Sequence, residues 1–299
     1  MLETVGVAVD EALLDDWRAR VERARLHLGW PALPVVARTH ADGASLALAA
    51  PVDELFTATE VNEWALCSAV HARDPERWPL LESAWRETQP ENLFLPPVLD
   101  EGTALVRLSQ LSGAERKPAL TALLVESVKR ALPWLLDDEQ LTLGLGAEGC
   151  SWPLTELPEP DEVAWRALKA IPVALVTGSN GKTTIVRLIA ACTRAQGWHT
   201  GLSSTDGVFV DDETLEVGDY SGPAGARTIL RDTRVEAAVL ETARGGILRR
   251  GLAIPLADAA VVSNLSVDHF GEYGIHDLEA LADVKLTVGR AVRRGRRSA

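Results

Sequence analysis

The chain has 299 residues, of which 46% are hydrophobic and 24% are charged, a composition typical of globular rather than disordered proteins. At roughly 150 residues per domain, this length predicts about two domains. The formal net charge of −13 argues against a general nucleic-acid-binding protein. No apolar run reaches the roughly 18–20 residues that a membrane-spanning helix needs, and the early acids argue against a signal peptide. Three scattered cysteines fit neither a disulfide framework nor a zinc site, so we expect a cytoplasmic protein.

Residues 1–150 predict a small α+β domain of unknown role. A helix is expected over 9–29, because apolar side chains recur there at helical spacing. The other elements predicted for this part are strands at 34–40 and 44–51, helices at 52–72 and 114–134, and a strand at 141–147. Its tryptophans are expected in the core, with a platform for a carbohydrate or a nucleobase as the alternative. Prolines within 151–170 predict a linker.

Residues 171–299 change to a pattern in which short apolar strands alternate with helices. The predicted strands are 171–177, 199–205, 235–241 and 257–264, and the predicted helices are 182–196, 222–231 and 277–292. This alternation predicts an α/β domain with a parallel sheet covered on both faces. Ligands of such sheets bind at the carboxyl ends of the strands.

The strongest functional signal is a glycine-rich stretch between the first of these strands and its helix. It comprises Gly178, Ser179, Asn180, Gly181, Lys182, Thr183 and Thr184. Glycines allow a tight turn around an anion, and we expect the amides of 180–183 to point at phosphate oxygens. Lys182 would reach the β- and γ-phosphates of a nucleotide, and the Thr183 hydroxyl would bind Mg²⁺. The alternative is a chance glycine-rich turn.

Polar residues also follow the next two buried strands. Glu241 ends its strand beside the expected phosphate loop, where nucleotide hydrolases place a magnesium ligand. Asn264 and His269 follow another strand, and a histidine there can ligate a metal or orient a phosphate. A surface glutamate is the alternative for Glu241, and the histidine alone is a weak signal.

In this order, the motifs resemble those of the Mur ligase family of ATP-dependent amide ligases. The matching stretches are GSNGKTT (178–184), ETARGG (241–246) and NLSVDH (264–269), together with Lys285 in LADVK. Within the family, residues 171–292 are most similar to the ligase domain of the cyanophycin synthetases. The stretches that carry this similarity are GLSSTDGVFV (201–210), DYSGPAGAR (219–227), ETARGGILRRGL (241–252) and DHFGEYGI (268–275).

The resemblance implies a phosphate-loop nucleotide-binding domain that uses ATP and Mg²⁺. A substrate carboxylate would become an acyl phosphate, which an amino acid or another amine would then attack. Residues 178–184 and Asn264 would bind the nucleotide, and Lys182, His269 and Lys285 would serve catalysis. Thr183 and Glu241 would hold one Mg²⁺, and His269 a second, with Lys285 carbamylated; a solvated helix lysine is the alternative for Lys285. Arg244 and Arg249 are candidates for clamping an anionic substrate, with surface ion pairs as the alternative.

Members of the family continue beyond the equivalent of Lys285 with further strands and a C-terminal domain. We therefore expect a nucleotide-binding domain that is incomplete at its C-terminus, in a truncated chain that is unable to complete ligation. The alternative for the final arginine-rich residues is a natural basic tail. Two other functions stay open: another phosphate-loop kinase or NTPase, and a non-catalytic nucleotide-binding protein. The carboxylate, the amine and the oligomeric state are not specified by these motifs.

Overall fold

The computed structural model describes residues 2–4, 9–40, 43–76, 100–266 and 275–293 of the chain. Contacts divide the chain into two compact units, Met1–Thr121 and Ala122–Ala299. The expected domain boundary lay at residue 150, so this division falls earlier in the chain. None of the helices in the described part is both long and apolar enough to span a membrane.

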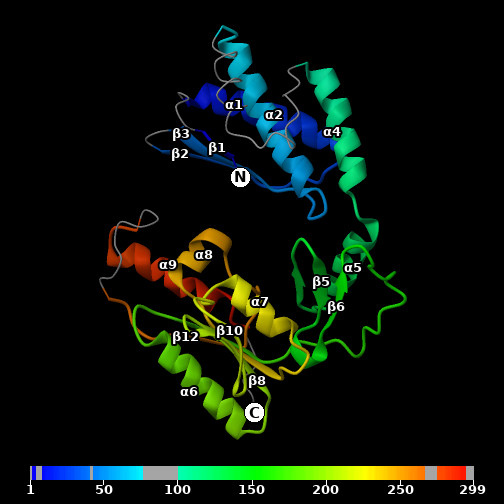
Figure 1. Ribbon diagram of the computed structural model, residues 1–299. Helices are drawn as coiled ribbons and strands as arrows, with labels where there is room; N and C mark the ends of the chain where they lie inside the picture. The colour runs from blue at the N-terminus through cyan, green and yellow to red at the C-terminus, as the bar shows by residue number, and fades with distance from the viewer. Residues whose placement is uncertain (1, 5–8, 41–42, 77–99, 267–274, 294–299) are drawn as a thin grey trace. The chain divides into compact units, whose positions relative to one another are not determined.

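The first unit is a three-stranded antiparallel sheet, in the order β1–β3–β2, packed with helices (Figure 1). Its elements are β1 (Leu2–Glu3), α1 (Glu11–Leu28), β2 (Val35–His40), β3 (Gly43–Leu48), α2 (Leu55–Arg73) and α4 (Glu101–Glu115). The expected α+β class is therefore present here, although α4 was not predicted.

Tryptophans fill the core of the first unit, as expected. Trp17 is fully buried on α1, and its Nε1 donates to Oδ1 of Asn62 on α2 at 2.9 Å. Trp30 and Trp64 are also buried, and Trp30 Nε1 donates to the buried carboxylate of Glu54. Trp17 and Trp30 thus satisfy their indole N–H groups inside the core, whereas Trp64 Nε1 has no hydrogen-bond partner among the described residues. Trp78 and Trp85 lie outside the described residues.

The predicted helix over 114–134 is wrong in its bounds. Helix α4 ends at Glu115, α5 (Pro118–Lys129) follows it, and Trp134 already belongs to the strand β4 (Trp134–Leu136). Two prolines explain the breaks, because a residue that precedes proline is driven out of the helical region. Pro118 forces a new start, and α5 ends at Lys129, shortly before Ala131, which has a positive φ of 51°, and Pro133.

The second unit contains a six-stranded sheet in the order β10–β9–β8–β11–β7–β12 and the three-stranded sheet β4–β5–β6. The elements that follow β4 are β5 (Gln140–Leu143), η1 (Gly146–Glu148), β6 (Cys150–Pro153), β7 (Val173–Thr177), α6 (Lys182–Ala195), β8 (Thr200–Ser204), β9 (Gly207–Val210), β10 (Glu213–Val217), α7 (Pro223–Arg231), β11 (Ala237–Glu241), α8 (Arg244–Arg250), β12 (Ala259–Val262) and α9 (Leu278–Arg290). The predicted strands and helices of 171–299 are thus present. The hairpin β9–β10, helix α8 and the strands β4 and β6 were not predicted.

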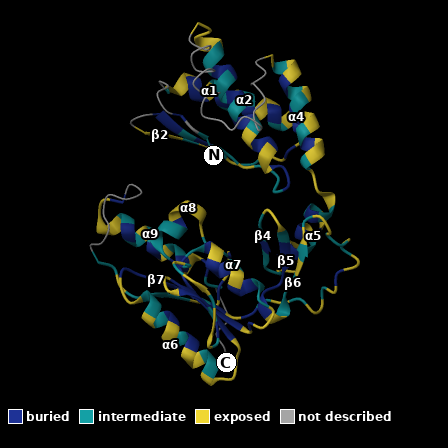
Figure 2. Cartoon of the chain, in the orientation of Figure 1, coloured by how far each residue is buried: buried dark blue, intermediate teal, exposed yellow. Residues whose placement is uncertain are grey.

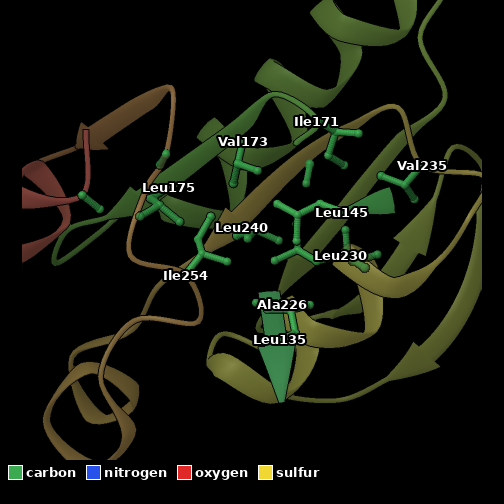
Figure 3. Close-up of a cluster of buried hydrophobic side chains, with 14 of the residues drawn as sticks. Leu135, Leu145, Ile171, Val173, Leu175, Ala226, Leu230, Val235, Leu240 and Ile254 are labelled. Atoms are coloured by element: carbon green, nitrogen blue, oxygen red, sulfur yellow. The ribbon is translucent and has the colours of Figure 1, made fainter. Parts of the chain in front are cut away.

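Four strands of the large sheet, β8, β11, β7 and β12, run parallel, as the sequence predicts. Their side chains alternate between two apolar layers, one of which is drawn in Figure 3. Leu175 and Leu240 pack on the side of α7 and α9, whereas Val176 and Val239 pack under α6. All five residues of β11 are buried, and its neighbour β7, which is labelled in Figure 2, is mostly buried as well. The predicted parallel sheet is thus present in these four strands, and β9 and β10 extend it as an antiparallel hairpin that was not predicted.

The small sheet β4–β5–β6 belongs to the second unit through its packing. Leu135 and Leu145 lie in the same apolar cluster as Val173 of the large sheet (Figure 3). Arg231 of α7 donates from Nε to Thr142 Oγ1 at 3.0 Å and forms an ion pair with Asp137. This shared core explains why the boundary between the two units precedes β4. Strand β6 occupies the start of residues 151–170, which we predicted to be a linker.

Candidate functional site

The glycine-rich loop lies between β7 and α6, at the carboxyl end of the parallel strands. Gly181 is the N-cap of α6 and has a positive φ of 78°, a conformation that favours glycine. Gly178 has a φ of 143°, and a Cβ there would lie only 1.8 Å from Ser263 Oγ. The loop therefore needs both glycines, one for its backbone turn and one for its close contact with the segment after β12.

The segment after β12 braces this loop through hydrogen bonds. Ser179 N donates to Asn264 O at 2.9 Å, and Asn180 N donates to Asn264 Oδ1 at 3.0 Å. Ser263 Oγ donates to Asn180 O at 2.6 Å. We expected Asn264 to bind the nucleotide and the Asn180 amide to point at a phosphate. Both remain predictions; in the structure the two residues bond to each other, so Asn264 also stabilises the conformation of the loop.

Thr183 and Glu241 meet directly at the start of α6. Thr183 Oγ1 donates to Glu241 Oε2 at 2.9 Å and lies 3.0 Å from Thr205 Oγ1. Glu241 ends the central strand β11 and is only 1% exposed. Its second oxygen, Oε1, has no hydrogen-bond partner among the described residues. The sequence predicted that Glu241 ends its strand beside the loop. In the structure, its carboxylate contacts the Thr183 hydroxyl.

A hydroxyl and a buried carboxylate with an unsatisfied oxygen fit a Mg²⁺ ion, because Mg²⁺ prefers oxygen ligands and commonly uses only one or two protein side chains. In the part of the chain that the structure describes, no three His, Cys, Asp or Glu side chains gather into a metal site. Thr183 and Glu241 would therefore hold the ion together with phosphate and water oxygens. His269 and its neighbour Asp268 lie outside the described residues.

Two lysines converge on Ser179 of the loop. Lys182 Nζ donates to Ser179 O at 3.2 Å, and Lys285 Nζ, from α9, donates to Ser179 Oγ at 3.3 Å. Lys285 is 5% exposed, so the solvated helix lysine considered from the sequence does not apply. Thr184 lies on the first turn of α6 and is exposed.

A cavity of about 520 Å³ opens beside these residues. Its walls come from the loop, from the segment before and at the start of α7, and from α8 and α9. The charged residues that line it are Lys182, Asp219, Arg244, Arg249, Arg250 and Lys285. The sequence singled out Arg244 and Arg249 but not Arg250 or Asp219. The arginines in ETARGGILRRGL could have indicated that Arg250 also lines the cavity, but helix α8, which carries them, was not predicted.

Comparison with known proteins identifies this region. Residues 176–296 match the model of the Mur ligase middle domain. A cyanophycin synthetase from Synechocystis is 48% identical over 122 residues, which are 41% of this chain and 14% of that protein. A UDP-N-acetylmuramoyl-L-alanyl-D-glutamate–2,6-diaminopimelate ligase from Pseudomonas syringae is 36% identical over 117 residues, or 37% of this chain and 24% of that protein.

A solved structure of a UDP-N-acetylmuramoyl-L-alanyl-D-glutamate–2,6-diaminopimelate ligase is 28% identical, with a TM-score of 0.37, and the match covers 42% of this chain and 26% of that one. The chain thus spans about a seventh of the length of the cyanophycin synthetase that it matches. The resemblance to Mur ligases expected from the motifs is confirmed over residues 176–296.

Proposed function

We infer from the Mur ligase middle domain at residues 176–296 that the second unit provides the nucleotide site of an ATP-dependent ligase. The ligase would join a carboxylate to an amino acid or another amine. The observation that carries this proposal is the contact between Thr183 Oγ1 and Glu241 Oε2 at 2.9 Å, directly beside a glycine-rich loop. A hydroxyl and a carboxylate in this position are the protein ligands that a magnesium–nucleotide complex requires.

The loop and its two lysines would bind the phosphates of ATP. The start of α6 offers backbone N–H groups that attract anions. Lys182 already lies along the loop, where its ammonium group would neutralise charge on the γ-phosphate as that charge spreads in the transition state. The bound Mg²⁺ would supply further neutralisation of the β- and γ-phosphate oxygens.

The proposed reaction has two steps. A carboxylate oxygen of the first substrate attacks the γ-phosphorus, the bond from this phosphorus to the bridging oxygen breaks, and ADP leaves. The product is an acyl phosphate. An amine nitrogen then attacks the acyl carbon, the carbon–oxygen bond to phosphate breaks, and the nitrogen loses a proton. The amide and inorganic phosphate are the products.

Lys285 and His269 complete the proposal. Lys285 is buried and borders the cavity, and we propose that its neutral amine, after loss of a proton, bonds to the carbon of CO₂ and releases a second proton, which gives a carbamate that would hold a second Mg²⁺. His269 would be a further ligand of that ion, and Asp268 would orient its imidazole. Each of these roles is carried over from the family motif, residue by residue.

Hydroxylamine provides a general test, because this small amine traps acyl phosphates as hydroxamates. The protein would be incubated with Mg·ATP, a panel of ¹⁸O-labelled carboxylates and hydroxylamine. We expect hydroxamate to form together with phosphate that carries one ¹⁸O atom from the carboxylate. The Lys182→Ala variant should lose both products, whereas Arg194→Ala, at the far end of α6, should keep them. A stable phosphorylated product that does not react with the amine would instead identify a kinase.

A further inference from the structure

The turn between β8 and β9 brings a further polar residue to the contact between Thr183 and Glu241. The two strands pair antiparallel, and Thr205 and Asp206 form the short turn that joins them. Thr205 Oγ1 lies 3.0 Å from Thr183 Oγ1, and Thr205 N donates to Glu241 Oε2 at 3.4 Å. One residue of the turn therefore contacts both of the side chains that are proposed to hold Mg²⁺.

Three contacts hold this turn in place, and all of them are made by Asp206. Its backbone N donates to Oγ of the fully buried Ser204 at 3.2 Å, and its backbone O accepts from Gly218 N at 3.3 Å. Its carboxylate accepts from Arg187 Nη2 of α6 at 2.7 Å. Thr205 thus approaches the site on a backbone that is fixed by its neighbours, as a residue that orients others requires.

The hydrogen bonds of the Thr183 hydroxyl fix the direction of its contact with Thr205. A threonine hydroxyl has one proton to donate and two lone pairs that accept, whereas an ionised carboxylate only accepts. The Thr183 proton therefore points to Glu241 Oε2. In the bond between the two hydroxyls, Thr205 is then the donor and Thr183 the acceptor. This arrangement leaves one lone pair of Thr183 Oγ1 for a cation.

The same turn residue restricts the carboxylate of Glu241, which is 1% exposed. Its Oε2 accepts from Thr183 Oγ1 and from Thr205 N. Its Oε1 has no hydrogen-bond partner among the residues that the structure describes. Two donors on one oxygen limit rotation of the carboxylate and leave the other oxygen for a metal ion. Thr205 thus acts on both side chains, on the hydroxyl through its own hydroxyl and on the carboxylate through its amide.

We propose that Thr205 is a positioning residue for the Mg²⁺ ion of the nucleotide complex. This proposal rests on the ligase function proposed above. Thr205 orients Thr183 and Glu241 before the ion binds, so that a lone pair of the hydroxyl and the free carboxylate oxygen are available to it. Partners that orient metal ligands in this way change metal affinity by about tenfold to a hundredfold when they are removed. Loss of the Thr205 hydroxyl should therefore weaken metal binding and leave the fold intact, because the Thr205 side chain is exposed.

Binding of Mn²⁺ to the full chain tests this role, because Mn²⁺ takes the same oxygen ligands as Mg²⁺ and its free form is measured by electron paramagnetic resonance. Titrations would be made with and without AMP-PNP. Thr205→Val removes the hydroxyl and keeps the shape of the side chain, and we expect about tenfold weaker Mn²⁺ binding. Thr205→Ser keeps the hydroxyl and should bind Mn²⁺ as the wild type does. Thr214→Val, at an exposed threonine of β10, is the matched control and should leave Mn²⁺ affinity unchanged.

Two further measurements distinguish positioning from a general structural role. The melting temperature without metal and the affinity for AMP-PNP in EDTA should be the same in Thr205→Val and the wild type, since neither quantity depends on the metal. In a Glu241→Gln background, Thr205→Val should weaken Mn²⁺ binding by less than it does in the wild type, because one of the two ligands that Thr205 orients has been lost.

Unchanged Mn²⁺ affinity in Thr205→Val would overturn the proposal, as would a Thr205→Ser variant that binds Mn²⁺ as weakly as Thr205→Val. The titrations with AMP-PNP separate this result from a failure of the ligase function. If Mn²⁺ and AMP-PNP bind equally well to the wild type and to Thr205→Val, the positioning role is wrong and the nucleotide site stands. If Mn²⁺ binding depends on the Thr205 hydroxyl but AMP-PNP does not bind, the positioning role stands and the ligase function is wrong. A wild-type chain that binds neither would overturn both.

Discussion

Thr183 Oγ1 lies 2.9 Å from Glu241 Oε2, although the two residues are 58 positions apart in the chain. The parallel pairing of β11 with β7 produces this contact, because it brings the ends of both strands to the same edge of the sheet. Glu241 is 1% exposed, and its Oε1 lacks a partner among the described residues. A buried carboxylate oxygen without a partner destabilises a fold by about 1–3 kcal/mol or more, so this arrangement favours a bound cation.

The Glu241→Gln variant should therefore separate stability from binding. Without Mg²⁺, we expect its melting temperature to equal or exceed that of the wild type, because a buried negative charge has been removed. Its affinity for Mg·AMP-PNP should fall about tenfold to a hundredfold. Calorimetry measures both quantities. Glu236→Gln is the control, since Glu236 is exposed just before the same strand and should leave nucleotide affinity unchanged. Undiminished affinity in Glu241→Gln would contradict a metal-binding role for this carboxylate.

The Gly178→Ala variant tests the close contact between the loop and the segment after β12. A new Cβ would lie 1.8 Å from Ser263 Oγ, on a backbone with a φ of 143°. We expect a loss of about 1–3 kcal/mol in the free energy of unfolding, measured in urea, and weaker nucleotide binding. Gly289→Ala, in helix α9 with open space around it, should instead gain about 0.5–1 kcal/mol. A Gly178→Ala protein as stable as the wild type would show that the loop does not need this contact.

Asn264 should affect nucleotide binding through the shape of the loop. Its side chain accepts from Asn180 N at 3.0 Å, and its Nδ2 donates to Asn180 O at 3.3 Å. Asn264→Ala removes both bonds, and we expect about tenfold weaker binding of Mg·AMP-PNP with a faster amide hydrogen exchange in residues 178–181. If binding weakens while exchange in the loop stays unchanged, Asn264 contacts the nucleotide instead of bracing the loop.

Local patterns predicted the elements around the site. The glycines of the loop, the apolar runs of β7 and β11, and the helical spacing after Lys182 are all signals within about ten residues. The sequence also placed Glu241 beside the loop that leads to Thr183, because parallel strands direct their carboxyl ends to one edge. The placement of Glu241 beside the loop follows from the order of the strands and helices alone.

Contacts between distant residues were harder to predict. The bond between Asn180 and Asn264 depends on how two loops meet, and the sequence therefore suggested a ligand contact for each residue separately. Strand β10 is mostly exposed and lacks the apolar run that marks the central strands, and β9 is an apolar strand of only four residues. Helix α8 has only seven residues, with two glycines that disfavour a helical prediction.

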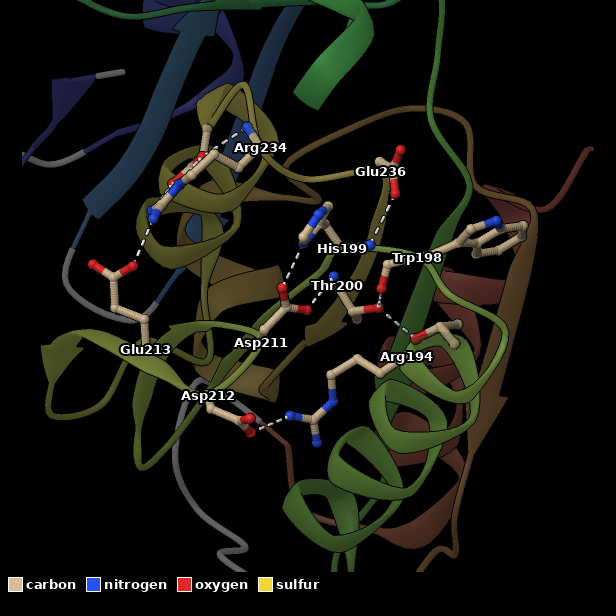
Figure 4. A network of polar contacts seen from close by, with 11 residues as sticks. Arg194, Trp198, His199, Thr200, Asp211, Asp212, Glu213, Arg234 and Glu236 are labelled. Carbon is tan, nitrogen blue, oxygen red and sulfur yellow. Dashed lines mark hydrogen bonds and ion pairs between the residues drawn. The ribbon is translucent and has the colours of Figure 1, made fainter.

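The pair formed by His199 and Asp211 predicts a pH-dependent contribution to stability at the opposite end of β8 (Figure 4). The hydrogen bond of His199 Nδ1 with Asp211 Oδ2, at 2.7 Å, raises the pKa of His199 above 6.5. Burial alone would raise the pKa of Asp211, but hydrogen bonds from His199 and Thr200 N outweigh it and lower this pKa below 3.8.

The stabilisation from the raised histidine pKa is complete below about pH 6.5 and is lost as the pH rises through its folded-state value. The stabilisation from the aspartate is present above about pH 3.8 and is lost as the pH falls through its lowered value. We therefore expect the melting temperature of His199→Gln to lie further below that of the wild type at pH 5.5 than at pH 8.5. The difference should be small, since the His199 side chain is 67% exposed. A constant difference across this range would show that the pair does not titrate on folding.

The most direct test of the account is the binding of Mg·AMP-PNP to the wild-type chain and to Lys182→Ala, measured by isothermal titration calorimetry. Lys182 Nζ lies along the loop, 3.2 Å from Ser179 O, and is proposed to contact a bound phosphate. The account predicts Mg²⁺-dependent binding by the wild type, a loss of about tenfold to a hundredfold in Lys182→Ala, and unchanged binding in Arg194→Ala. Equal affinities in the wild type and Lys182→Ala, or no binding by the folded wild type, would contradict a nucleotide site at this loop.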